Sequence, residues 1–129
     1  MNDLIIEKQK KEFYTFPEIN FNCTTGVCSI IGESFMENAK EFYQPVFDWL
    51  DEFIKINPGI KIILEINLSY YNTSSSKALY MLFYKLKEFK TSGRLIEINW
   101  RYKYSDREME DDITDLQFET GLDINAIGE

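Results

Sequence analysis

Hydrophobic and polar residues alternate most regularly along residues 60–68, which predicts a β-strand. The apolar positions on one side of this segment are Ile60, Ile62, Leu64, Ile66 and Leu68. A period of two with many β-branched residues is typical of a strand with one buried face. Shorter runs predict strands at 17–23, 27–31 and 94–100. The first two pair as a hairpin around the turn Thr24-Thr25-Gly26, because glycine tolerates positive φ there.

Apolar residues recur at helical spacing in three other segments. The first helix starts at Ser34, which forms a capping box with Glu37, and ends before residues 57–59. Pro45 interrupts its apolar stripe and predicts a kink near 41–45 or two abutting helices. The second helix covers 78–89 and ends with Gly93 as a left-handed cap.

The third helix covers 108–119, with Ile113, Leu116 and Phe118 turned inward, and it ends at Gly121. Residues 122–124 add a last short strand. Two strand–helix–strand connections imply parallel pairing of the strands that they join. The fold class is therefore α/β, a single domain with a mixed sheet, an N-terminal hairpin and helices packed over it.

The length of 129 residues fits one domain, 1–129, with a core at about 17–124 and residues 1–16 forming an arm or a short strand. The net charge of −8 argues against binding to nucleic acid or to an anionic membrane. No apolar run could span a bilayer and the N-terminus is no signal peptide, so the expected location is cytoplasmic.

The chain has no histidine, which removes the usual catalytic triads and most zinc sites. Cys23 and Cys28 flank the predicted turn; they are either ordinary reduced thiols on paired strands, which we favour, or a redox pair. The residues therefore offer no histidine-based catalytic site, and we expect no metal site and no cofactor.

Five short polar residues separate the strand at 60–68 from the second helix, more than one helix cap requires. They are Asn72, Thr73, Ser74, Ser75 and Ser76, followed by Lys77. Such side chains cap helices, and they stand where free amides and the helix dipole favour negative charge. A phosphoryl group on one of these hydroxyls would suit that position, so the loop is either a phosphorylation site or a cap alone.

Two other functions use the same loop. A module for a small anionic ligand or nucleotide would bind at the helix N-terminus, although neither GxxxxGK[ST] nor GxGxxG follows the strand. A serine hydrolase would need flanking glycines and a histidine base, which the segment lacks.

Several motifs resemble the SiaC family of bacterial regulatory phosphoproteins from about residue 17 to 124. They are 32–39 (GESFMENA), 42–45 (FYQP) with Trp49-Leu50, 71–77 (YNTSSSK), and 100–102 (WRY) followed by the acidic run 106–112. The run contains Arg107 where the family is usually acidic. The resemblance implies a fold similar to STAS domains, the anti-anti-sigma-factor type, and no catalytic activity.

The resemblance also implies a regulatory cycle. A kinase resembling anti-sigma-factor kinases would phosphorylate Thr73, and a PP2C-type phosphatase would remove the phosphate. The unphosphorylated form would bind and activate a diguanylate cyclase, which raises cyclic di-GMP and promotes aggregation or biofilm formation. A relative acting on another output enzyme, or as an anti-anti-sigma factor in a sigma-factor circuit, stays open.

Further residues are candidates for the partner-binding surface. They are Glu33, Ser34, Glu37, Asn38 and Tyr71. Capping and loop hydrogen bonds are the alternative explanation for the first four.

Overall fold

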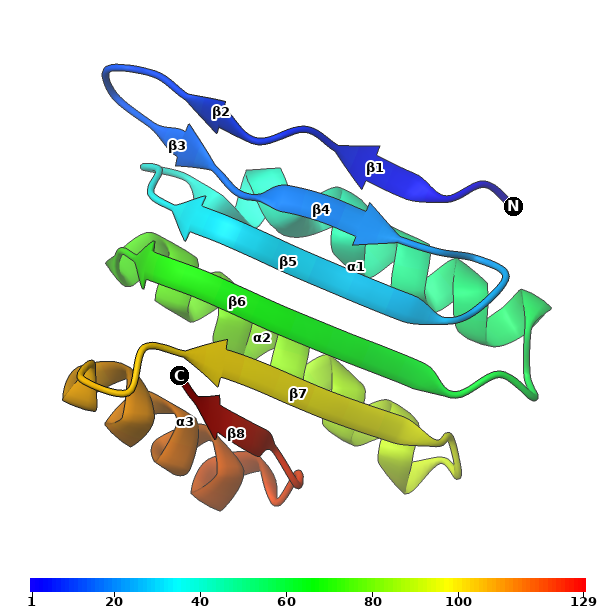
Figure 1. The fold of residues 1–129 in the computed structure, drawn as a ribbon. Helices are drawn as coiled ribbons and strands as arrows, with labels where there is room; N and C mark the ends of the chain where they lie inside the picture. The colour runs from blue at the N-terminus through cyan, green and yellow to red at the C-terminus, as the bar shows by residue number, and fades with distance from the viewer.

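A six-stranded sheet with all three helices on one face forms the body of the protein (Figure 1). The structure is a computed structural model that describes residues 1–129. The strands are β1 (Leu4–Ile6), β2 (Gln9–Lys10), β3 (Thr15–Phe16), β4 (Glu18–Phe21), β5 (Val27–Ser34), β6 (Ile62–Tyr71), β7 (Ile96–Tyr102) and β8 (Asn125–Gly128). The helices are α1 (Ala39–Ile56), α2 (Thr73–Thr91) and α3 (Arg107–Thr120).

The strand order is β1-β4-β5-β6-β7-β8, and β2 and β3 form a separate two-stranded ladder. The pairs β1–β4 and β4–β5 are antiparallel, whereas β5, β6, β7 and β8 run parallel to one another. The predicted α/β class, with its mixed sheet and N-terminal hairpin, is therefore confirmed. Within the expected arm, Leu4–Ile6 is a real strand that covers the edge of β4.

The start of α1 differs from the sequence prediction. Ser34 ends β5 instead of capping the helix, and Asn38 is the N-cap, with its side chain accepting a hydrogen bond from the Glu41 amide. The predicted capping box of Ser34 and Glu37 is therefore wrong. The physical reason is that the Ser34 hydroxyl is hydrogen-bonded to the buried Ser75 hydroxyl and so does not cap the helix.

Pro45 lies inside α1 without dividing it, so the prediction of two abutting helices is wrong. The ring is on the exposed side of the helix, while Val46 and Phe47 beside it are buried. The carbonyl that loses its helical partner one turn back belongs to Glu41, which is also exposed. Water can hydrogen-bond that carbonyl, and the buried stripe of α1 keeps the helix on the sheet.

The C-terminal part corrects two further predictions. Phe118 is 90% exposed instead of inward, although Ile113 and Leu116 are buried as expected. Gly121 ends α3 at φ 69°, as predicted. The last strand lies at 125–128 because Leu122 and Ile124 instead fill the core below the sheet.

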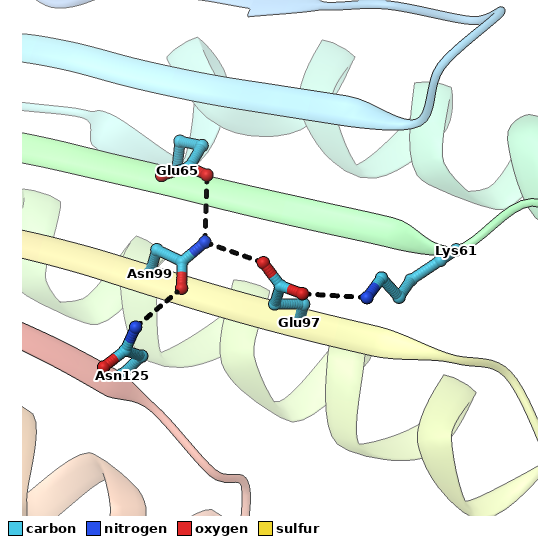
Figure 2. Close-up of polar contacts among 5 residues, drawn as sticks. All are labelled: Lys61, Glu65, Glu97, Asn99 and Asn125. Atoms are coloured by element: carbon cyan, nitrogen blue, oxygen red, sulfur yellow. Dashed lines mark hydrogen bonds and ion pairs between the residues drawn. The ribbon is translucent and has the colours of Figure 1, made fainter.

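Polar side chains join three strands across the face of the sheet that carries no helix (Figure 2). The Lys61 ammonium lies 2.8 Å from Glu97, and the Asn99 amide donates to Glu97 and to Glu65 at 2.9 Å each. Asn125 donates to the Asn99 carbonyl at 3.2 Å. The bonds from Lys61 and Asn99 lower the pKa of Glu97. These side-chain hydrogen bonds connect the edge strand β8 to β7 in addition to the backbone pairing of the two strands.

Arg94 closes the end of the molecule where α1 stops and β6 and β7 begin. Its guanidinium donates to the carbonyls of Ile54, Asn57 and Ile60, at 2.7, 2.9 and 3.2 Å. The C-terminal carbonyls of a helix lack helical partners, so the arginine satisfies groups that α1 leaves free. One side chain therefore fixes the end of α1, the loop after it and the strand β7 that Arg94 precedes.

We expect Arg94→Leu to lower the free energy of unfolding by about 1.5–3 kcal/mol, the range for hydrogen bonds to a charged group. Arg101→Leu is the matched control, because Arg101 forms an exposed pair with Glu129 that contributes about 1 kcal/mol or less. Urea denaturation measures both variants, and equal losses would contradict the role given to Arg94.

Candidate functional site

Two strand–helix junctions lie side by side where β5 leads into α1 and β6 leads into α2 (Figure 1). Asn72 joins them. Its side-chain oxygen accepts from the Ser75 amide at 3.0 Å and so caps α2. Its side-chain nitrogen donates to the Met36 carbonyl at 2.8 Å, and its backbone amide donates to the Ser34 carbonyl at 3.1 Å. One residue thus starts α2 and holds the neighbouring junction.

Ser75 and Ser34 form a buried hydroxyl chain with Tyr43. The Ser34 hydroxyl lies 2.7 Å from that of Ser75 and 2.9 Å from that of Tyr43, and Ser75 donates to the Ser34 carbonyl at 3.0 Å. Both serines and Tyr43 are fully buried. Burial raises the pKa of the Tyr43 phenol to about 12, so this hydroxyl stays neutral. The chain connects α2, β5 and α1 where no water reaches.

Ser74 makes the third connection between the junctions. Its hydroxyl donates to the Glu37 carbonyl and accepts from the Ala39 amide, both at 2.9 Å. Ala39 is the first residue of α1, so Ser74 satisfies one of the amides that a helix leaves free at its start. The hydroxyls of Ser74 and Ser75 are therefore both occupied by structural hydrogen bonds.

Thr73 differs from these two serines. It is the first residue of α2, its side chain is exposed, and its hydroxyl has no hydrogen bond to another residue. Ser76 is half-buried and also has no such bond. Lys77, one helical turn after Thr73, is exposed and belongs to no ion pair. Within the predicted loop, Asn72, Ser74 and Ser75 therefore build the junction, whereas Thr73 is exposed to solvent.

Tyr71 connects the junction to α3. Its hydroxyl donates to a carboxylate oxygen of Asp112, and its ring lies 6.3 Å from that of Trp100. Burial first, and the Asp112 carboxylate second, raise the pKa of Tyr71 above its ordinary value. The phenol is therefore a hydrogen-bond donor at neutral pH, and it holds the first half of α3 beside the end of β6.

The candidate partner-binding residues also divide into exposed and buried side chains. Glu37 and Asn38 are exposed and Glu33 is half-buried, whereas Ser34 is fully buried and offers a partner no surface. For Ser34 the interpretation as a partner contact is therefore wrong. Sequence reasoning missed Tyr43 and Asp112, because their hydrogen bonds reach 9 and 41 residues along the chain.

The remaining chemistry is sparse. No group of three or more His, Cys, Asp or Glu side chains is placed to hold a metal ion. None of the helices is both long enough and apolar enough to cross a membrane. Cys23 and Cys28 are free thiols, one half-buried and one buried.

The fold and the junction define a single-domain α/β protein with a mixed sheet and a hydroxyl-rich turn that leads into a helix. The chain belongs to the SiaC family, since the model for "SiaC family regulatory phosphoprotein" matches residues 6–129. A protein of Pseudomonas aeruginosa strain UCBPP-PA14 is 33% identical over 86 residues, which cover 67% of this chain and 68% of the relative.

Solved structures agree with this assignment. Apo-SiaC from Pseudomonas aeruginosa superposes with a TM-score of 0.83 at 26% identity, over 99% of this chain and all of that one. A second SiaC structure from the same organism gives 0.82 at 26% identity, over 100% and 98% of the two chains. A structure of the diguanylate cyclase SiaD in complex with its activator SiaC, also from Pseudomonas aeruginosa, gives 0.82 at 23% identity, over 96% and 100%.

We expect Ser75→Ala to lower the free energy of unfolding by about 1–3 kcal/mol, because it removes two buried hydrogen bonds. Thr73→Ala, two residues away, should change it by no more than about 0.5 kcal/mol. Urea denaturation of both variants tests this contrast. Equal effects would show that the buried hydroxyl chain does not stabilise the junction.

Proposed function

We propose that this chain is a non-enzymatic regulatory phosphoprotein whose binding to partner proteins is switched by phosphorylation of Thr73. The observation that carries the proposal is the exposure of the Thr73 hydroxyl beside serines whose hydroxyls are bound within the fold. A kinase needs access to the hydroxyl that it modifies. Ser75 could be modified only after the buried chain had opened, whereas Thr73 needs no such change.

The first turn of α2 can accept a phosphate. Free amides and the helix dipole favour a negative group at a helix N-terminus, and no acidic residue occupies this turn. Lys77, four residues on, is free to pair with the phosphate along the same helix face. The phosphate therefore changes the charge of the surface without disrupting the helix.

The effect on partners follows from that charge. A partner packed closely over the start of α2 would have to remove water from a dianion, which is costly without a matching cation. The unphosphorylated form is therefore the one that binds the effector. The family assignment, and the Pseudomonas aeruginosa complex in which SiaC activates the cyclase SiaD, support a diguanylate cyclase as that effector.

Two further partners complete the cycle. A Ser/Thr kinase of the anti-sigma-factor type adds the phosphate, and a PP2C-type phosphatase removes it. The family description as a regulatory phosphoprotein supports both activities without naming them.

Incubation with the cognate kinase and ATP, followed by mass spectrometry, tests the proposed site. We expect one phosphate per chain on Thr73 and no phosphate on the Thr73→Val variant, because valine has no hydroxyl to accept the phosphoryl group. Ser76→Ala is the control, because it removes the other unbonded hydroxyl of the loop and should leave the reaction unchanged. Phosphate found only on another residue would contradict the proposal.

A further inference from the structure

A hollow of about 460 Å³ lies beside the junction, between the β2–β3 ladder and the start of α1. Its lining residues are Phe13, Tyr14, Phe16, Met36, Glu37, Asn38, Glu41 and Phe42. Four of these are aromatic and two carry carboxylates. The proposed phosphorylation does not account for this surface.

Three of the four aromatic rings of the hollow form a continuous wall. Tyr14 stacks on Phe16 with ring centroids 4.4 Å apart, and Phe16 lies 4.5 Å from Phe42. Phe13, at the tip of the ladder, is 79% exposed. A phenylalanine that leaves most of its surface in water forgoes much of the free energy that burial would give it.

The carboxylates at the rim have no cation. Glu37 and Glu41 are exposed, and neither takes part in any of the four ion pairs of the chain. The Asn38 amide donates to Glu41 at 3.2 Å and so holds that carboxylate beside the aromatic wall. Ring faces and carboxylates both attract cations, so the two kinds of group favour the same ligand.

We propose that this hollow docks an arginine or lysine side chain presented by a partner protein. The carbon stem of such a side chain packs on the rings while its charge lies near Glu37 and Glu41. The open rim favours a side chain over a small free cation, because an exposed hollow leaves a free cation largely hydrated. A partner that contacts the rest of the surface supplies the binding energy that one exposed cation site lacks.

The position of the hollow links it to the switch without making it depend on the switch. The loop at 36–38 separates the hollow from α2, and Asn72 and Ser74 hold this loop through the carbonyls of Met36 and Glu37. A partner covering both sides of the loop would contact the cation site and the start of α2 together. The cation site itself needs no phosphate, so it goes beyond the proposed function.

NMR titration of the unphosphorylated full-length chain tests the proposal. The probe is a blocked peptide, acetyl-Ala-Leu-Arg-Leu-Ala-amide, and its control replaces the arginine by citrulline, which has nearly the same shape and no charge. We expect the arginine peptide to shift the resonances of Phe13, Phe16 and Phe42. Its affinity should exceed that of the citrulline peptide by about five- to thirtyfold.

Two variants locate the binding. Glu37→Gln combined with Glu41→Gln should weaken the arginine peptide by a similar factor, and so should Phe13→Ala, whose exposed ring is not needed for folding. Glu52→Gln is the control for the loss of negative charge, because Glu52 is an exposed, unpaired acid on α1, the helix that also carries Glu41.

Equal binding of the arginine and citrulline peptides would overturn the proposal, as would unchanged binding in the double variant. Absence of saturable shifts up to about 10 mM peptide would overturn it too. Binding of spermidine more tightly than the peptide would assign the hollow to a free cation and contradict docking of a protein side chain. None of these outcomes depends on Thr73, so the proposed switch is judged separately.

Discussion

Side-chain hydrogen bonds from the turn at 72–75 to backbone carbonyls at 34–37 hold the two strand–helix junctions together. Asn72 and Ser74 reach the carbonyls of Met36 and Glu37, and Ser75 reaches that of Ser34. Parallel strands leave their loops at the same edge of the sheet, where backbone groups need partners that no strand supplies. Short polar side chains provide those partners, which explains why the loop contains so many of them.

This constraint also separates the structural hydroxyls of one short segment from the hydroxyl that we propose for phosphorylation. Because Ser74 and Ser75 are committed to the junction, a modification there would break the contacts that place α1 and α2. Thr73 stands at the solvent side of the same turn, where a phosphate meets free amides. The switch that we propose therefore changes the surface and leaves the fold in place.

Much of the fold could be predicted from the sequence, because the periods of two and of 3.6 are local. The alternation at 60–68 gave the central strand β6, and the apolar spacing gave all three helices. The errors arose where distant contacts decide the outcome. The sequence predicts Ser34 as a helix cap, but its hydroxyl is hydrogen-bonded to Ser75, 41 residues away. It predicts Phe118 in the core, but the orientation of α3 leaves this side chain exposed.

The candidate site could be predicted in part, because its run of short polar residues is a local feature of the sequence. The hydroxyl-rich loop is visible as a run of short polar residues, and the motif resemblance pointed to Thr73 within it. The sequence could not distinguish the exposed hydroxyl from the committed ones, because that difference lies in contacts with residues 34–39. The aromatic hollow could not be predicted either, since Phe13, Phe16 and Phe42 line one hollow only after the β2–β3 ladder has folded beside the start of α1.

The affinity of this chain for the diguanylate cyclase that we propose as its effector, measured by calorimetry with threonine or phosphothreonine at position 73, tests the central claim most directly. We expect tight binding of the unphosphorylated chain and a Kd at least about tenfold higher for the phosphorylated one, with an unfolding free energy that the phosphate does not lower. Equal affinities of the two forms, with one phosphate confirmed on Thr73, would contradict it.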